Sequence, residues 1–342
     1  MSLTPKTVPT GAIRYNTDSN KMECFNGDIW MQVSVSSPDL GKSTNSDIAG
    51  GARGIFAGGA DPNHSSMIQA FDITTTGNTF EFGHLSADRY YIMGCSSRTR
   101  AVWAGGSEGG GYVDTIEYST IASTGNYTAF GELVGPDRHN TGGGLGNQTR
   151  GLYMGGENPG KHSEIDQITI ASTGNSVNFG HLSADRASNT TFASPTRGIS
   201  AGGTQPTHVN TIDYVTIATE GTAQDFGDQS TSVYGGGGGG NSTRGIMMSG
   251  FKSPNNVSTI QYVTIASTGN SVYFGDVTQQ RRYGATCSSP TRAVYCGGAN
   301  PAVDDRMDYI NIATLGDAVD FGDLFDHMYA CDNGCSTAHG GL

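Results

Sequence analysis

The chain carries eight histidines, the side chains most often used for acid–base catalysis near neutral pH. Their spacing does not group them. Two of them, His84 and His181, occupy the same place in copies of the segment Phe-Gly-His-Leu-Ser-Ala-Asp-Arg. One interpretation is a site duplicated by symmetry. The interpretation we favour is a loop residue that was copied along with its repeat.

Three Asp-Arg pairs have the charges to bind an anionic ligand: Asp88-Arg89, Asp137-Arg138 and Asp185-Arg186. We favour a structural role, in which they tie neighbouring repeats together through hydrogen bonds. Six cysteines lie at positions 24, 95, 287, 296, 331 and 335. They show no paired framework, and Cys331 and Cys335 have no matching pair to complete a zinc site. We therefore expect buried free thiols, no metal and no cofactor.

Other catalytic signatures are missing from the sequence. There is no Ser-x-Asp-x-Gly-x-Thr-Trp box of sialidases and no Ser-His-Asp signature. The glycine run Gly235–Gly240 lacks the Lys-Thr that follows in a phosphate-binding loop. No spacing marks out a Tyr/His/Cys set for a copper oxidase. The sequence predicts that the chain is not an enzyme. The alternative that stays open is a carbohydrate-active or oxidase enzyme.

A repeat of about 48 residues determines the expected organisation of the chain. An arginine followed by a Gly-Gly pair, or by Ser249-Gly250 in one copy, recurs six times. The steps between successive arginines are 47, 50, 47, 47 and 48 residues, from Arg53, Arg100, Arg150, Arg197, Arg244 and Arg292. A single catalytic site needs asymmetry, so sixfold recurrence indicates a scaffold role for these arginines.

Each repeat predicts four short antiparallel strands and no helix. The first is rich in small residues, and the second runs from the arginine to the Gly-Gly pair. The third alternates apolar residues, as in Ile260-Gln-Tyr-Val-Thr-Ile265, and a Ser-Thr-Gly-Asn turn follows it. The fourth ends in Phe-Gly. Glycine-rich first strands fit a crowded axis, so six such sheets predict a six-bladed β-propeller.

The repeat resembles kelch. An arginine opens the first strand (Arg89, Arg138, Arg186 and Arg282), Gly-Gly closes the second, a tyrosine lies in the third and an aromatic residue in the fourth. The fourth-strand aromatic is Phe where kelch usually has Trp. The resemblance covers residues 51–342 and implies an all-β, six-bladed, kelch-like β-propeller.

The ring of such a fold needs a closing strand. Residues 327–338 look like another first strand with no second, third or fourth strand after them. We expect this C-terminal strand to complete the first sheet, since an open ring would expose two sheet edges. The competing hypothesis gives that place to residues 43–51.

The N-terminal residues 1–35 have a different pattern. Strands are predicted over residues 8–17, 21–25 and 28–33, with Asn26-Gly27 as a hairpin signal. Such a three-stranded meander is marginal alone. We therefore expect Tyr15, Phe25 and Trp30 to anchor it on something else. Residues 36–50 are predicted to be a linker.

This segment resembles a module of tailed-bacteriophage fibre and other virion proteins. The matching residues are Thr10, Gly11, Ile13–Thr17, Phe25–Gly27 and Trp30. The resemblance implies a phage structural protein, either a tail-fibre or receptor-binding protein or a surface-decorating one. It also implies contacts of residues 1–35 with other virion proteins, and it leaves a homotrimer as a further expectation. The expected localisation is the virion.

The loops between second and third strands vary from repeat to repeat, unlike the turns at the opposite ends of the strands. Variable loops on a rigid scaffold commonly carry binding function. The candidate contacts with a host receptor or glycan are Tyr112, His162, His208, Lys252 and Arg306. Neutral drift of exposed loops is the alternative for each of them.

Composition limits the other partners. The net charge is −12, so nucleic acid is not an expected partner. No apolar run reaches membrane-spanning length and no signal-peptide pattern begins the chain, so we expect no membrane insertion.

Overall fold

A computed structural model describes residues 9–16, 21–32, 52–60, 63–134, 143–329 and 334–342. All regular structure in these ranges is β-strand, which confirms the all-β class. The chain divides into two compact units, Met1–Gly50 and Gly51–Leu342.

The larger unit is built from four-stranded antiparallel sheets, as the repeat predicted. The described residues form six of them, numbered one to six in the chain order of their second strands. In spatial order, sheet one is β33 (Cys335–Ser336), β4 (Arg53–Ala57), β5 (Met67–Asp72) and β6 (Phe80–His84), and sheet two is β7 (Met93–Ser96), β8 (Arg100–Ala104), β11 (Thr115–Thr120) and β12 (Thr128–Glu132). Sheet three is β13 (Gly144–Gly146), β14 (Arg150–Glu157), β15 (Lys161–Thr169) and β16 (Val177–His181), and sheet four is β17 (Thr190–Ala193), β18 (Arg197–Ala201), β19 (Thr211–Thr216) and β20 (Gln224–Asp228). Sheet five is β21 (Gly237–Gly240), β22 (Arg244–Met248), β25 (Thr259–Thr264) and β26 (Val272–Asp276), and sheet six is β27 (Ala285–Ser288), β28 (Arg292–Cys296), β31 (Arg306–Asn311) and β32 (Val319–Asp323). Short hairpins extend three of the loops: β9 (Ser107–Glu108) with β10 (Gly111–Tyr112), β23 (Phe251–Lys252) with β24 (Asn255–Asn256), and β29 (Ala299–Asn300) with β30 (Ala302–Val303).

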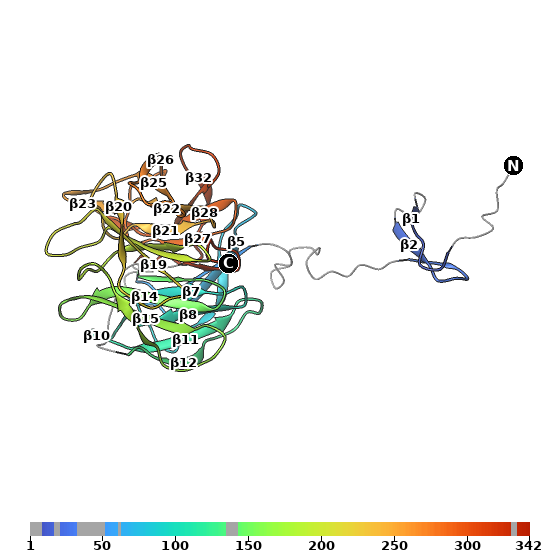
Figure 1. The fold of residues 1–342 in the computed structure, drawn as a ribbon, viewed down its shortest axis with the longest axis horizontal. Helices are drawn as coiled ribbons and strands as arrows, with labels where there is room; N and C mark the ends of the chain where they lie inside the picture. Colours follow the sequence, from blue (N-terminus) through green and yellow to red (C-terminus); the bar gives the residue numbers. More distant parts are fainter. Residues whose placement is uncertain (1–8, 17–20, 33–51, 61–62, 135–142, 330–333) are drawn as a thin grey trace. The chain divides into compact units, whose positions relative to one another are not determined.

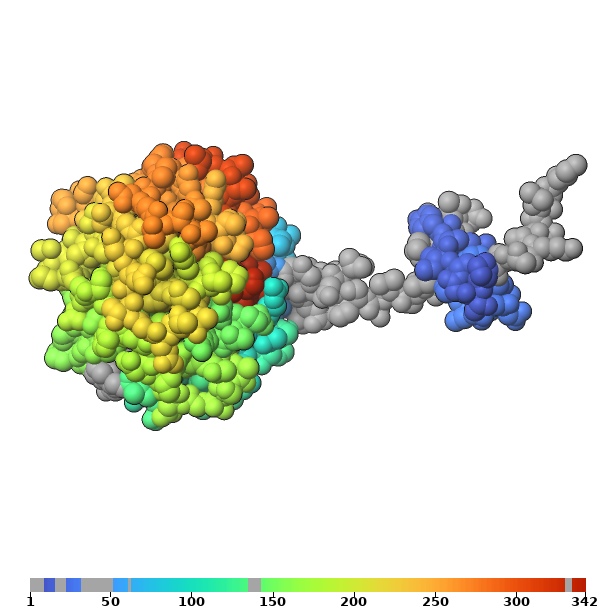
Figure 2. Space-filling model, in the orientation of Figure 1, coloured from blue at the N-terminus to red at the C-terminus, as the bar shows by residue number. Residues whose placement is uncertain are grey.

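Sheet one takes its first strand from the other end of the chain. Strand β33 pairs antiparallel with β4, so that Cys335 lies opposite Ile55 and Ser336 opposite Gly54. The red C-terminal residues therefore adjoin the cyan residues of sheet one on the surface (Figure 2). The competing segment, residues 43–51, lies outside the described residues.

The sheets succeed one another in chain order, from cyan to red in Figure 1. The first strand of each sheet contacts the first strand of the next, and β33 contacts both β27 and β7. These strands approach so closely that a Cβ on Gly144 would overlap the carbonyl of Gly94, and one on Gly238 that of Thr191. Close approach of backbones explains why the first strands are rich in glycine.

The apolar core lies between neighbouring sheets. Ile55 and Phe82 of sheet one, for example, pack in one cluster with Trp103 and Ile121 of sheet two. Each sheet therefore buries both faces against its neighbours, and a single repeat could not bury them alone.

The recurrent arginine at the start of each second strand joins its sheet to the next one. Its guanidinium donates a hydrogen bond to the backbone carbonyl of an isoleucine that follows the neighbouring third strand. Within the described residues the bonds run from Arg53 to Ile121, Arg100 to Ile170, Arg150 to Ile217, Arg197 to Ile265, Arg244 to Ile312 and Arg292 to Ile73. The last of these joins sheet six to sheet one.

A second contact between sheets explains two other motifs. The turn glycine of each Thr-Gly, Glu-Gly or Leu-Gly turn lies against the Phe-Gly of the preceding sheet, and its amide donates to the phenylalanine carbonyl. The pairs are Gly77–Phe321, Gly125–Phe82, Gly174–Phe130, Gly221–Phe179, Gly269–Phe226 and Gly316–Phe274. The glycine after each phenylalanine leaves room for this turn: a Cβ on Gly275 would overlap the carbonyl oxygen of Gly316.

Because of this close approach, we expect a methyl group added at Gly275 to destabilise the fold. Gly275→Ala should lower the free energy of unfolding by at least ~2 kcal/mol, because the clash is with backbone and not with a flexible side chain. Gly160→Ala is the matched control, since nothing lies within 4 Å of a Cβ at Gly160. Urea denaturation of both variants checks this, and equal stability of the two would contradict it.

The N-terminal unit forms the predicted meander, with β1 (Ile13–Asn16), β2 (Lys21–Phe25) and β3 (Trp30–Gln32) in that order. Cys24 pairs with Ile13 on one side and with Met31 on the other. The Asn26 side chain accepts hydrogen bonds from the amides of Asp28 and Ile29, which explains the strength of the Asn-Gly turn signal.

Candidate functional site

The loops between second and third strands share one face with the connections between sheets. Antiparallel bridges join the two kinds of segment in five of the sheets: Ala60–Tyr329, Tyr90–Ser107, Ala187–Thr204, Tyr234–Phe251 and Arg282–Ala299. We call this the loop face. The connections therefore contribute side chains to this face as well as the variable loops.

The five candidate residues occupy five different loops of this face. Tyr112 is exposed in β10, and Lys252 is exposed in β23. His162 lies in β15, where its Nε2 is 2.9 Å from the carbonyl oxygen of Asn158. The Arg306 guanidinium donates to the Gln279 side chain. These four therefore line separate stretches of the face rather than one site.

His208 has a different setting, because it belongs to a chain of ring contacts that crosses several sheets. Its ring lies 4.7 Å from Tyr234 and 6.0 Å from Phe251, measured between ring centroids. Tyr234 lies 5.9 Å from Tyr283, and Tyr283 lies 5.6 Å from Tyr91.

The contacts continue from Tyr91 to Tyr90, at 4.7 Å, and from Tyr90 to His64, at 4.2 Å. We call the whole series the aromatic arc, and all of its members are half-buried: His64, Tyr90, Tyr91, His208, Tyr234, Phe251, Arg282 and Tyr283.

Two tyrosines of the arc have left-handed backbones, with φ of 57° at Tyr91 and 60° at Tyr283. The equivalent connection residue before sheet five is Gly235, with φ of 62°. Glycine adopts this conformation freely, whereas a tyrosine there costs about 1–2 kcal/mol. Ser188 before sheet four has the same conformation, with φ of 57°, so the repeat sets this backbone geometry. At Tyr91 and Tyr283 it brings two tyrosine rings into contact.

Arg282 lies among the rings. Its guanidinium carbon is 4.6 Å from the centroid of Phe251 and 5.4 Å from that of Tyr283. It also donates a hydrogen bond of 3.2 Å to the Tyr234 hydroxyl. The sequence-based prediction that Arg282 is the arginine opening the first strand is therefore wrong. Arg281 takes that structural place, which leaves Arg282 on the loop face.

The structural arginines of the connections are buried and paired with acids on the third strand of the following sheet. The pairs are Arg89–Glu117, Arg186–Asp213 and Arg281–Asp308. Burial lowers the pKa of the Arg89 and Arg186 side chains, and the paired carboxylates oppose that shift. Asp88 and Asp185 are not the acids in these pairs.

Sheets that lack the buried connection arginine also lack the acid on the third strand. Val233 takes the arginine's place before sheet five, and Met328 takes it before sheet one. The third strands of these sheets carry Gln261 and Gln69 instead of an acid. A buried arginine is thus matched by a carboxylate, and an apolar residue by a neutral amide. Asp137-Arg138 lies outside the described residues.

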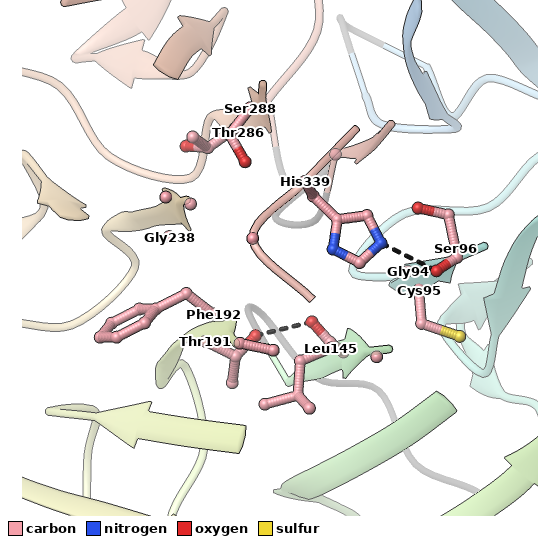
Figure 3. A pocket seen from close by; sticks show the side chains of 17 residues that line it. Gly94, Cys95, Ser96, Leu145, Thr191, Phe192, Gly238, Thr286, Ser288 and His339 are labelled. Carbon is pink, nitrogen blue, oxygen red and sulfur yellow. Dashed lines mark hydrogen bonds between the residues drawn. The ribbon is translucent and has the colours of Figure 1, made fainter. Parts of the chain in front are cut away.

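A small cavity lies among the first strands, close to the turns that lead from first to second strands. His339 and first-strand residues such as Ser96, Leu145 and Thr191 line it (Figure 3). Its volume is about 40 Å³. The His339 ring points across it and lies 2.8 Å from the Ser96 carbonyl oxygen, and the Thr191 hydroxyl donates to the Gly144 carbonyl on its wall. This volume suits water rather than a substrate, which needs roughly 300 Å³ or more.

His339 gives the stability a predictable pH dependence. Burial, with a smaller contribution from Arg98, lowers its pKa from 6.5 to about 4. The unfolded chain then binds a proton that the folded chain does not, so stability is complete above pH 6.5 and falls between pH 6.5 and 4. The fall should total no more than ~3 kcal/mol. Urea denaturation at pH 4 to 7.5 should show a shallower dependence for His339→Gln; identical slopes would contradict this assignment.

The described residues contain no group of three or more His, Cys, Asp or Glu side chains placed to hold a metal ion. Cys95, Cys287, Cys296 and Cys335 are buried free thiols, and Cys24 is a half-buried one. Burial raises the pKa of Cys95 and of Cys287 to about 12. The predicted sixth thiol, Cys331, lies outside the described residues.

The Cys95 and Cys287 thiols should therefore be unreactive in the folded protein. At pH 8, iodoacetamide should alkylate Cys24 at least ten times faster than Cys95 and Cys287, because only thiolate reacts. Mass spectrometry of peptides from native and urea-unfolded protein measures the rates. Alkylation of native Cys95 at the rate of Cys24 would contradict the assignment.

The three predicted anchors of the N-terminal meander do not share a face. Arg14 stacks on Trp30 at 4.2 Å and pairs with Glu23, and Phe25 contacts Trp30 at 5.3 Å. Tyr15 follows Arg14 in the strand and so points to the other face, where it is 56% exposed. Phe25 and Trp30 thus contribute to the meander's own packing, and Tyr15 is the anchor that remains exposed.

Comparison with known proteins gives no match, either to a family model or to a curated protein. In the part of the chain that the structure describes, no helix has the length and apolar character to cross a membrane.

Proposed function

We propose that this chain is a non-enzymatic structural protein of a tailed-bacteriophage virion. Residues 1–35 attach it to other virion proteins, and residues 51–342 present the loop face outward for contact with a host surface. The resemblance of the N-terminal meander to a phage-fibre module supports this proposal. The exposed Tyr15 supplies a contact side chain at the predicted attachment unit.

We also propose that the six sheets are the blades of a kelch-like β-propeller. The observation that carries this proposal is the hydrogen bond from Arg292 of sheet six to the Ile73 carbonyl of sheet one. It repeats the arginine–carbonyl bond found at each of the five other junctions between neighbouring sheets. The pairing of β33 with β4 supplies the missing first strand of sheet one. A rigid ring of this kind suits display rather than conformational switching.

The attachment role predicts the behaviour of two matched tyrosine variants. Tyr15→Ser should reduce the amount of this protein per purified particle at least fivefold, because it removes an exposed apolar contact from the attachment unit. Tyr273→Ser, which changes a tyrosine of similar exposure on β26, should leave it unchanged. Quantitative mass spectrometry of purified particles measures both.

Two results would overturn the proposed function. One is the absence of the wild-type protein from particles purified from the source lysate. The other is equal incorporation of the Tyr15→Ser and Tyr273→Ser variants, which would remove the role assigned to the N-terminal unit.

A further inference from the structure

We propose that the aromatic arc is a carbohydrate-binding site. This inference deepens the proposed function, since it rests on the loop face being the surface presented to the host and names the ligand class of that face.

The first argument is the kind of surface that the arc offers. Pyranose rings have apolar C–H faces, and partly exposed tyrosine rings can stack against them while their hydroxyls stay near water. Tyr90, Tyr91, Tyr234 and Tyr283 are half-buried. Neighbouring tyrosine rings among these four meet at angles between 47° and 68°, for example 68° between Tyr91 and Tyr283. The arc is therefore a faceted surface rather than one flat platform, which suits a chain of sugar units over a single planar ring.

The second argument is the hydrogen-bonding capacity among the rings. Sugar hydroxyls need donors and acceptors in fixed directions beside the stacking surface. A guanidinium has five N–H donors, and one of those of Arg282 donates to the Tyr234 hydroxyl. Phe251 and Tyr283 hold the guanidinium between them, so its direction is fixed before any ligand arrives. The imidazoles of His64 and His208 stand at the two ends of the arc.

The third argument is that the fold holds these side chains in place at a cost. Tyr91 and Tyr283 occupy left-handed backbone positions where two other repeats have Ser188 and Gly235. The backbone of each connection is fixed by the bonds between neighbouring sheets, as when the Tyr283 amide donates to the Gly235 carbonyl. Preorganised side chains lose little conformational entropy on binding, which favours a weakly interacting ligand such as a sugar.

Two cationic side chains lie in or beside the arc, although the loop face also carries acids such as Glu108, Asp304 and Asp305. Arg282 lies within the arc and Lys252 follows Phe251 in β23, whereas the chain carries a net charge of −12. Saccharides that carry a carboxylate should therefore bind more tightly than neutral ones of the same length, and added salt should reduce that difference.

The test uses the full chain and a defined panel: maltohexaose, cellohexaose, chitotetraose, hexameric polygalacturonate and 3′-sialyllactose. Saturation-transfer NMR and calorimetry measure binding. The wild-type protein should bind at least one member with a dissociation constant in the millimolar range or tighter. Tyr234→Ala and Arg282→Ala should each weaken that binding tenfold or more.

Matched variants separate binding from folding. Tyr273→Ala and Tyr127→Ala change exposed tyrosines outside the arc and should leave binding within twofold of wild type. Tyr234→Phe keeps the ring and loses the hydroxyl, so it should retain more binding than Tyr234→Ala. Thermal unfolding identifies any variant that fails to fold, and Tyr90→Ala then replaces it in the comparison.

The inference is overturned if the wild-type protein binds no member of the panel, or if the arc variants bind as well as Tyr273→Ala. It is also overturned if the loop face binds only a host protein whose affinity survives enzymatic removal of its glycans. Particle incorporation, measured separately, tests the proposed virion role, so failure of sugar binding would leave that role standing.

Discussion

The hydrogen bond from each recurrent arginine to a carbonyl of the next sheet is the interaction on which the larger unit depends. Hydrogen bonds from a charged donor contribute more than neutral ones, about 1.5–3 kcal/mol each. In four sheets the same guanidinium also stacks on the tyrosine of its own third strand, as Arg244 does on Tyr262 at 4.9 Å. One side chain thus fixes the spacing within a sheet and the angle to its neighbour. The motif that runs from the arginine to Gly-Gly supplies the guanidinium. The third-strand motif, such as Ile260-Gln-Tyr-Val-Thr-Ile265, supplies the stacking tyrosine and the acceptor carbonyl.

The arrangement of the loop face follows from that frame. Because each connection is held between two sheets, the residues one and two positions after its buried arginine emerge at a fixed place on the loop face. Tyr90 and Tyr91 follow Arg89, and Arg282 and Tyr283 follow Arg281. In sheets one and five an apolar residue replaces the arginine and a glutamine replaces the acid. The backbone of the connection keeps the same geometry there. Buried pairing therefore preserves the frame while the exposed residues beside it are free to vary.

The sequence predicted the sheets well because their determinants are local and repeat. Alternating apolar residues, turn glycines and Phe-Gly endings each act within a few residues, and the four-stranded antiparallel sheets confirm them. Of the aromatic arc only His208 was a predicted contact, because its rings come from loops and connections as far apart in the sequence as His64 and Tyr283. A signal was present: Tyr90 and Tyr91 follow Arg89, Tyr283 follows the Arg281-Arg282 pair, and Tyr234 follows Val233. The double arginine Arg281-Arg282 hid which side chain is buried, and only the pairing of Arg281 with Asp308 separates them. In the meander, Tyr15, Phe25 and Trp30 looked equivalent because composition does not show which face of a strand each occupies.

The most direct test of this account compares the arginine that joins sheet six to sheet one with one between two consecutive sheets. Arg292 donates to the Ile73 and Thr74 carbonyls and stacks on Tyr309 at 4.7 Å, and Arg197 donates to Ile265 and stacks on Tyr214 at 4.6 Å. If the six sheets form a closed ring, in which sheet six packs against sheet one, Arg292→Ala and Arg197→Ala should each lower the free energy of unfolding by ~2 kcal/mol. A neutral Arg292→Ala beside a costly Arg197→Ala would show that the last sheet does not meet the first, and would contradict the account.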